Sequence, residues 1–580
     1  MSKLFIENLK KGLNNDKKDI LKHIYEPTVV TIPLSDSRRD LCVLPNGEIR
    51  SYGRLYSNNH TSGDNGQTAY LSSKDCGLSW SINYSYGKMN SCTYLEKGSI
   101  YITVCDSYNN YNGEGNGLYV YRSETGPDDP EPEVVKLSGE RYIDSFLPKQ
   151  SEYSDRVWFT AQLNGNPIFF YSDDLGITWV KREIPNPHCF ETVFPHKGFR
   201  WCKGSGTEPN VIEFSKDNMM MIIRTPMDCF YKSYSKDGGD TWSVPEPTDF
   251  YGTNTTAYLL KLSDGRIVNF WNNTKPLSQP NLKKIPTSSE RVANGMGENA
   301  FTNRDAAHAA ISEDVGKTFI GYREILLNPI RNNSDFRYIG GIKSSADKSV
   351  HQFQAFELPF NKILVSVGQN ASSRKLVIFD IDWLYETSRK EDFLMGTEDV
   401  TTHTYLKSIS GCHYKEVGNG HCAWNRIQSA VPVPDPEGGF NEVISVSKHH
   451  DERLINDISG VCWNFPLSKK GRVTIHIKIA EKQARFVLLD RWYNVCDPYA
   501  AYQSPFWFEL DVSDIGDGYA KVDIDFDTSD KMANVLVNDE ILFKVKMTAD
   551  CTVGISYLIM QCACDGDSKG FFIKSMEKTN

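Results

Sequence analysis

The sequence predicts an all-β protein, a six-bladed β-propeller followed by a β-sandwich of the jelly-roll type, and three observations support this fold. An eight-residue turn motif recurs four times between residues 73 and 319. Short strand-like segments separated by turns fill residues 28–395, whereas longer alternating strands fill residues 410–580. The composition, with 29 Tyr, 29 Phe and 11 Trp, favours strands over helices.

The repeated motif has the form S-x-D-x-G-x-[ST]-[WF] and stands at residues 73–80, 172–179, 235–242 and 312–319. The Ser hydroxyl and Asp carboxylate can bond backbone groups of a tight turn, Gly supplies a positive φ, and the closing aromatic packs on the sheet. Successive Asp residues are 99, 63 and 77 residues apart. A four-stranded blade of roughly 60 residues fits this spacing. The longest interval leaves room for a blade whose motif is lost.

This motif resembles the Asp box of the sialidase superfamily. In that family the boxes lie at blade rims, away from the chemistry, so the resemblance in the boxes implies a fold and not a function. The repeat region divides into six units at about 60 residues per blade, which is also the number of blades in sialidases.

Residues 1–27 have no apolar core of signal-peptide length and are predicted to form one or two short amphipathic helices outside the propeller. No stretch approaches the length of a membrane span, so we expect no membrane association and a cytoplasmic location. A net charge of −10 without a Lys/Arg run gives no support for a nucleic-acid partner.

The 14 cysteines are expected to be reduced and mostly buried. Two spacings suggest metal ligands, Cys412-His413 with His421-Cys422, and Cys562-Ala-Cys564. Neither contains the C-x₂-C pairs of a structural zinc site, so we expect no metal and no cofactor.

Residues 410–580 contain no Asp box, and their alternating strands with Gly and Asp turns predict a β-sandwich. This order of domains resembles the concanavalin-like jelly rolls appended to glycan-active enzymes. Five aromatic residues could either stack on sugars or pack in the core of the sandwich, namely Trp492, Tyr493, Tyr499, Tyr502 and Trp507.

Three residues in the repeat region follow the order of a sialidase site. Glu208 and Arg224 are 16 residues apart, one hairpin's length, so both can end at the same rim. Arg304 precedes the Asp of the fourth box by 10 residues. The resemblance implies that Glu208 is a site carboxylate and that Arg224 and Arg304 belong to a triad of arginines.

Three arginines from three blades suit an anionic ligand, because each guanidinium stays charged and offers a planar fork to a carboxylate. Sialic acids and related 2-keto sugar acids carry such a carboxylate on the anomeric carbon. The first arginine of the triad should open the first blade, where Arg39 is the preferred candidate and Arg38 the second.

The general acid should lie on a polar loop after the first strand pair. Asp64 lies 25 residues past Arg39 and before the first box, and it resembles the acid/base aspartate of the family. Such a group would protonate the leaving oxygen and then activate water. His60 and Asp106 are the reserve candidates.

The sequence departs from the family at the nucleophile. Sialidases use a tyrosine, because a carboxylate nucleophile would be repelled by the substrate's own carboxylate. Its expected place is taken by Gln352, with His351 beside it, and Tyr338 could reach the site from an insertion. Three explanations remain open: a sialidase rescued by Tyr338, a related glycosidase attacking with water, or a non-catalytic binder.

The expected function is exo-hydrolysis of a terminal acidic sugar, sialic acid or a related keto-deoxy sugar acid, from a glycan. Glu208, Arg224 and Arg304 would define the pocket. The alternatives are a glycan-binding propeller that has lost catalysis, and a lyase or hydrolase of different sugar specificity.

Overall fold

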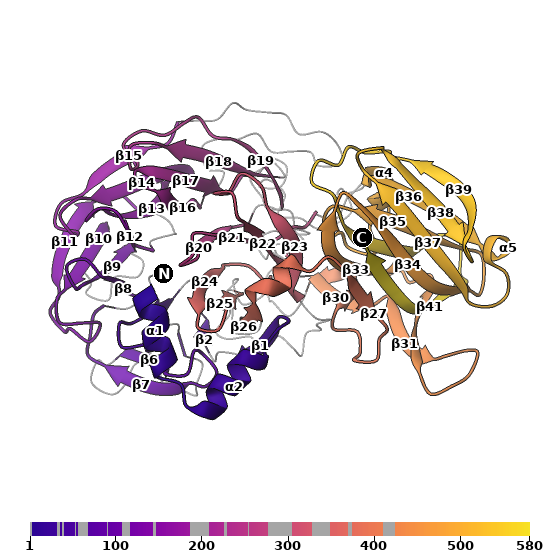
Figure 1. Cartoon of the computed structure of the whole chain (residues 1–580), viewed down its shortest axis with the longest axis horizontal. Helices are drawn as coiled ribbons and strands as arrows, with labels where there is room; N and C mark the ends of the chain where they lie inside the picture. The colour runs from indigo at the N-terminus through magenta and orange to yellow at the C-terminus, as the bar shows by residue number, and fades with distance from the viewer. Residues whose placement is uncertain are drawn as a thin grey trace.

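The structure is a computed structural model, and it consists of a ring of six four-stranded antiparallel sheets beside two larger sheets that face each other (Figure 1). The residues it describes are 3–31, 35–36, 40–52, 54–55, 68–89, 91–106, 117–142, 147–185, 208–225, 229–252, 255–275, 304–327, 349–368, 374–409 and 424–580. The ring is the predicted six-bladed propeller. Among the described residues, no helix has the length and apolar character that crossing a membrane requires.

Each of five blades contains four strands in sequence order, and the first of these strands lies innermost. The first blade contains β3 (Leu41–Val43), β4 (Ile49–Ser51), β6 (Thr68–Ser73) and β7 (Ser81–Ser85), and the second contains β8 (Thr93–Leu95), β9 (Ile100–Asp106), β10 (Leu118–Ser123) and β11 (Glu133–Ser138). The third contains β12 (Lys149–Gln150), β13 (Val157–Leu163), β14 (Asn166–Ser172) and β15 (Val180–Glu183), and the fourth contains β16 (Asn210–Ser215), β17 (Asn218–Ile223), β18 (Cys229–Ser235) and β19 (Glu246–Tyr251). The fifth contains β20 (Tyr258–Lys261), β21 (Ile267–Trp271), β22 (Ala306–Ser312) and β23 (Ile320–Leu327).

The sixth blade closes the ring with strands from both ends of the propeller. It contains β24 (Gln354–Leu358), β25 (Lys362–Val367), β26 (Lys375–Asp380) and, as its outer strand, β1 (Thr28–Thr31). Because β1 precedes the first blade in sequence and pairs with β26, the hydrogen bonds of this sheet join the beginning of the ring to its end. A short pair, β2 (Ser35–Asp36) and β5 (Arg54–Leu55), lies outside the six blades.

Each Asp box forms the turn between the third and fourth strands of its blade, and all four use the same hydrogen bonds. In the third box the Ser235 hydroxyl donates to Asp237 Oδ1 at 2.8 Å, and the Thr241 amide and hydroxyl donate to the same carboxylate at 2.9 and 2.5 Å. In every box the residue directly before the glycine of the motif has a positive φ. This residue is Cys76, Leu175 or Val315 in the first, second and fourth boxes, with φ near 60°. Gly238 fills that position in the third box, at φ 68°.

The 99-residue interval contains the predicted blade without a box, formed by β8 to β11. Its third turn replaces the motif with a looser Ser–Asp arrangement. The Ser123 hydroxyl donates to Asp129 Oδ2 at 2.6 Å, and Thr125 donates to the same oxygen at 3.0 Å. The turn is therefore still fixed by a buried serine and an aspartate, although the eight-residue pattern is lost.

Two helices, α1 (Lys3–Lys11) and α2 (Asn15–His23), pack their apolar sides on the first and last blades. Phe5, Leu9 and Leu21 are buried against strand residues such as Leu41 and Leu376. A cavity of about 580 Å³ follows the axis of the ring and is lined by residues of all six innermost strands.

The C-terminal sheets form the predicted β-sandwich. One contains β31 (Ala430–Pro434), β32 (Glu442–Lys448), β41 (Ser568–Thr579), β34 (Lys470–Ile479), β37 (Ala520–Asp527), β38 (Met532–Val537) and β39 (Glu540–Lys546), with β27 (Arg389–Glu391) pairing β41. The other contains β28 (Val400–Thr401), β33 (Ser459–Ser468), β40 (Ile555–Cys562), β35 (Gln483–Leu489) and β36 (Phe506–Asp511). A separate hairpin joins β29 (His403–Ile409) to β30 (Trp424–Gln428).

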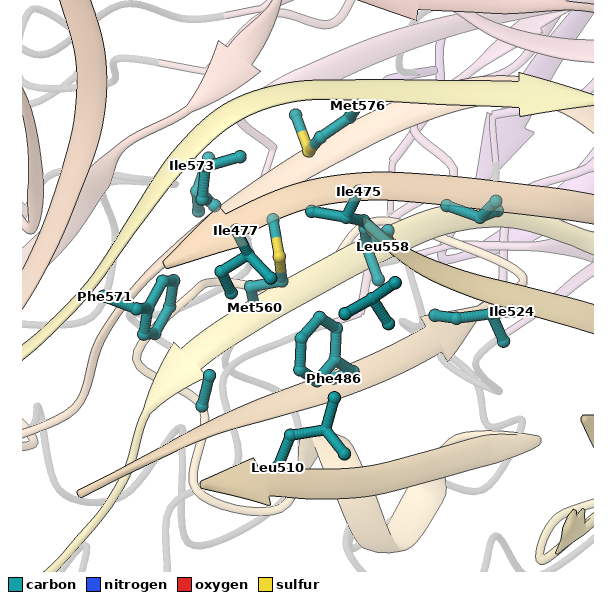
Figure 2. Packing of buried hydrophobic residues seen from close by; sticks show 14 of the residues in the cluster. Ile475, Ile477, Phe486, Leu510, Ile524, Leu558, Met560, Phe571, Ile573 and Met576 are labelled. Carbon is teal, nitrogen blue, oxygen red and sulfur yellow. The ribbon is translucent and has the colours of Figure 1, made fainter. Parts of the chain in front are cut away.

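The sandwich core comes from the alternation of its strands. Along β34 every second residue is buried, including Ile475 and Ile477, and these face Phe486 and Leu558 of the other sheet (Figure 2). Of the five aromatic residues, Trp492 and Tyr493 are 0% and 1% exposed and belong to the buried cluster that the sandwich shares with Ala306 of the propeller, whereas Tyr502 is 65% exposed.

The fifth blade packs directly on the sandwich. The Trp492 amide donates to the Asn273 carbonyl at 2.9 Å, and the Lys275 amide donates to the Trp492 carbonyl at 2.9 Å. Ala306 of the propeller belongs to the same buried cluster as Trp492 and Tyr557 of the sandwich. This interface lies next to the segment that carries Arg304.

Candidate functional site

Glu208 and Arg224 form a buried ion pair at one edge of the fourth blade. Arg224 Nη1 donates to Glu208 Oε2 at 2.6 Å. Glu208 lies two residues ahead of β16 and Arg224 directly follows β17, and the pairing of Asn210 with Ile222 aligns these strand ends. The hairpin spacing seen in the sequence therefore does bring the two side chains into contact.

Arg304 contacts His351 across the boundary between the fifth and sixth blades, with Arg304 Nη1 and His351 Nε2 3.2 Å apart. Because a guanidinium can only donate, Nε2 accepts, and the ring proton is assigned to Nδ1, which faces the Ser349 hydroxyl at 2.9 Å. In this arrangement His351 is neutral and both of its nitrogens are engaged. It is thus poorly placed to hold a nucleophilic water.

The two pairs lie on the same face of the ring. Antiparallel strands place the start of the first strand, the end of the second and the start of the third at one edge of a blade. Neighbouring innermost strands are aligned start to start, because the Leu259 amide donates to Asn210 Oδ1 at 3.1 Å and the Leu41 amide donates to Gln354 Oε1 at 3.0 Å. Glu208 and Arg304 lie just ahead of such strand starts, as does His351.

The Asp boxes lie at the opposite edge of the blades. β22 separates Arg304 from the fourth box, so a full strand of about 3.3 Å per residue lies between them. The boxes are accordingly remote from the Glu208–Arg224 and Arg304–His351 pairs.

Gln352 has a strained backbone on this face. Its φ is 63°, in the left-handed region that a residue other than glycine seldom adopts, and its side chain is 4% exposed. Among the described residues its Oε1 has no hydrogen-bond partner. Strained residues with unsatisfied polar atoms are concentrated at functional sites, so the residue in the expected nucleophile position has a local geometry consistent with a functional role.

Arg374, a buried arginine that no motif in the sequence singles out, lies on the same face. Its Nη2 donates to Asp40 Oδ1 at 2.7 Å, and the Ser51 hydroxyl donates to Asp40 Oδ2 at 2.6 Å. Asp40 follows Arg39 in sequence just as Asp305 follows Arg304. This recurring Arg-Asp dipeptide is the sequence signal that indicates Asp40 and Asp305.

Several predicted site residues lie outside the described residues, namely Arg38, Arg39, His60, Asp64 and Tyr338. Asp106 is the last residue of β9. The Cys412 to Cys422 segment also lies outside them, whereas Cys562 Sγ and Cys564 Sγ are 3.9 Å apart in the sandwich. In the described part of the chain, no group of three His, Cys, Asp or Glu side chains is arranged to hold a metal ion.

Comparison with known proteins identifies a repeat domain within the propeller. Residues 149–336 match the family model described as BNR repeat-like domain. The anhydrosialidase of Macrobdella decora is 30% identical over 129 residues, which are 22% of this chain and 14% of that protein. The matched segment therefore spans only a small part of that relative.

Comparison with solved structures finds sialidases at low sequence identity and low TM-score. A Trypanosoma rangeli sialidase complex is 11% identical, with 94% of this chain and 91% of that chain covered and a TM-score of 0.34. The NanB sialidase of Streptococcus pneumoniae is 13% identical, with 64% and 73% covered and a TM-score of 0.37. The leech intramolecular trans-sialidase is 13% identical, with 61% and 69% covered and a TM-score of 0.35.

Proposed function

We propose that this chain is an exo-glycosidase that releases a terminal acidic sugar from a glycan; the match of residues 149–336 to the BNR repeat-like domain supports this proposal. The sugar would be sialic acid or a related keto-deoxy sugar acid. The relationship to an anhydrosialidase over 129 residues supports a substrate of this chemical class.

The observation that carries the proposal is the position of Arg224 and Arg304. They come from adjacent blades, at blade edges on the same face of the ring, and both are largely buried. Gathering guanidinium groups in a place shielded from water is unfavourable unless an anion compensates their charge. A substrate carboxylate would supply such an anion through bidentate hydrogen bonds.

The proposed chemistry needs an acid, a carboxylate near the anomeric carbon and a nucleophile. Asp64 is the proposed proton donor, and Arg39, with Arg38 as the alternative, is the proposed third arginine. Glu208, held by Arg224, would either take the proton of Tyr338 or orient a water. Since both nitrogens of His351 have partners, Glu208 is the better candidate for the base.

Hydrolysis of a fluorogenic α-sialoside by the purified full chain tests this proposal. Arg224→Met and Arg304→Met should each raise KM by about tenfold or more, the size expected from losing a hydrogen bond between charged groups. Arg266→Met is the matched control, because Arg266 lies in the fifth blade but pairs with Asp264 at its other edge. An equal loss of activity in Arg266→Met would contradict the assignment of Arg224 and Arg304 as carboxylate-binding residues.

A second candidate, a glycan-binding propeller without catalysis, is favoured by one observation. Gln352 cannot act as a nucleophile or as a base, yet it takes the expected place of the tyrosine. In that case the chain would bind a free sugar acid, with binding weakened by Arg304→Met, but would not turn over a sialoside at any pH. Binding calorimetry beside the hydrolysis assay separates the two functions.

A further inference from the structure

A buried polar cluster lies between the propeller and the C-terminal part, directly beside Arg304. Its centre is Asp305, which is fully buried. Arg426 Nη2 donates to Asp305 Oδ1, the Tyr405 hydroxyl donates to Oδ2, and His403 Nε2 lies 3.3 Å from Oδ2. The three partners all come from the β29–β30 hairpin, and none is more than 3% exposed.

The hairpin presents these groups in one fixed arrangement. His403 and Tyr405 are two residues apart on β29, so they share a face of the strand. Tyr405 is paired with Arg426 across the ladder, and the Arg426 guanidinium lies 5.3 Å from the centre of the Tyr405 ring. Both oxygens of a single carboxylate are therefore held by one two-stranded element.

The positive charge of Arg426 balances the negative charge of Asp305. Burial opposes ionisation of Asp305, but the Arg426 charge and the bonds from His403 and Tyr405 outweigh it and hold the pKa of Asp305 below its usual range. Burial lowers the pKa of His403, so its imidazole is neutral at pH 7. A buried ion pair of this kind often stabilises a protein no more than apolar residues of the same volume would, and its better-attested role is to specify one geometry.

That geometry is transmitted to Arg304 through one peptide bond. The Arg304 carbonyl accepts from the Val350 amide at 2.8 Å, and Asn272 Nδ2 donates to the Ala306 carbonyl at 2.7 Å. The segment 304–306 is thus fixed by the propeller through its backbone and by the hairpin through Asp305. Asp40, next to Arg39, is held in the same way by the buried Arg374.

We propose that the β29–β30 hairpin positions Arg304 by holding the Asp305 carboxylate through hydrogen bonds. This hairpin, which follows the propeller in sequence, would thereby complete the propeller's carboxylate pocket. Asp305, Arg426, Tyr405 and His403 are positioning residues, which act through Arg304 and touch no substrate. The ligand of Arg304 is the one given by the proposed function, and the inference rests on that function to this extent.

Two tyrosine variants of the full chain test the inference. Tyr405→Phe removes one hydroxyl from the cluster. Tyr557→Phe is its matched control, because Tyr557 is equally buried in the same interface and donates to another carboxylate, Glu324 Oε1, at 2.6 Å. Two quantities are measured in both variants: the KM and kcat for an α-sialoside, and the hydrogen-exchange rate of the Val350 amide, which reports on its bond to the Arg304 carbonyl.

Tyr405→Phe is expected to raise KM about tenfold with kcat nearly unchanged, as for the loss of one hydrogen bond to a charged group. It should also speed exchange at Val350 by about tenfold, whereas Tyr557→Phe should change neither quantity. Arg426→Lys, which keeps the charge but loses the planar fork, should shift KM in the same direction. Should Tyr405→Phe fold poorly, Arg426→Lys provides the comparison with Tyr557→Phe.

A normal KM in Tyr405→Phe accompanied only by a lower melting temperature would overturn the inference, as would equal changes in both tyrosine variants. Failure of the proposed function gives a different result, because the unmodified chain would then neither cleave nor bind an acidic sugar. In that event the exchange rate decides alone, and unchanged exchange at Val350 in Tyr405→Phe would overturn the positioning role.

Discussion

Arg224 Nη1 and Glu208 Oε2 are 2.6 Å apart, although the residues are separated by a complete hairpin. The short bond fixes a carboxylate and a guanidinium at one blade edge, where Glu208 is 6% exposed. A charge-assisted bond of this length orients both groups before any ligand arrives. In the proposed function, the pair would supply a preorganised anion-binding group and a carboxylate that can receive a proton.

Glu208→Gln should lower kcat by a factor of about 100 or more, because the amide keeps the shape of the side chain but cannot accept a proton. The control is Glu213→Gln, which lies within β16, five residues beyond Glu208. It should leave kcat within about twofold of the unmodified protein. A fully active Glu208→Gln enzyme would exclude Glu208 as the base.

Asp237→Ala should lower the free energy of unfolding by ~1–3 kcal/mol, because it removes the acceptor of three hydrogen bonds in the third box. KM should stay nearly constant, since the box lies at the edge of the blade away from Arg224. Denaturant unfolding and steady-state kinetics give the two values. A large change in KM without loss of stability would mean that the boxes belong to the site.

Glu324→Gln should change how the melting temperature depends on pH. Burial raises the pKa of Glu324 to about 7, despite the opposing hydrogen bond from Tyr557. A raised pKa in the folded protein favours the protonated state, so this contribution is present below pH 4.5 and is lost as the pH rises towards 7. Its size is up to roughly 3 kcal/mol.

The measurement is calorimetric melting of both proteins between pH 5 and 8, in steps of about half a unit. The unmodified chain should lose stability relative to Glu324→Gln as the pH rises. Glu313→Gln, at an exposed glutamate of the same blade, should run parallel to the unmodified chain. Parallel curves for all three proteins would show that Glu324 ionises normally.

The configuration of the first product distinguishes the two nucleophiles. If Tyr338 attacks and Glu208 takes its proton, the anomeric configuration is retained and Tyr338→Phe is inactive. If water attacks, the configuration is inverted and Tyr338→Phe stays active. We expect inversion, because Gln352 stands in the tyrosine's usual place. NMR of the first-formed anomer decides between them, and retention with an inactive Tyr338→Phe would exclude direct attack by water.

The fold could be predicted from the sequence because its determinants are local. Each Asp box contains within eight residues the donors, acceptors and positive-φ positions of its turn, so the repeat spacing alone indicated the blades. The alternation along β34 likewise indicated a half-buried sheet strand. The role of β1 in closing the sixth blade has no such signal, since its partner β26 lies more than 300 residues away.

The candidate site could be predicted only where its residues share a hairpin. The spacing of Glu208 and Arg224 predicts their contact, which is present in the structure. The contact between Asp305 and Arg426 joins residues that are 121 positions apart, and no periodicity relates them. His351 was a candidate base from its position, but its hydrogen bonds to Arg304 and Ser349 depend on the meeting of two blades.

A structure of the full chain with a bound acidic sugar tests the central claim most directly. The account predicts that the sugar carboxylate lies within about 3 Å of the guanidinium groups of both Arg224 and Arg304, the distance of a charge-assisted hydrogen bond. The anomeric carbon should then face Glu208. A sugar bound elsewhere, or a carboxylate that contacts neither arginine, would contradict the assignment of this face as an acidic-sugar site.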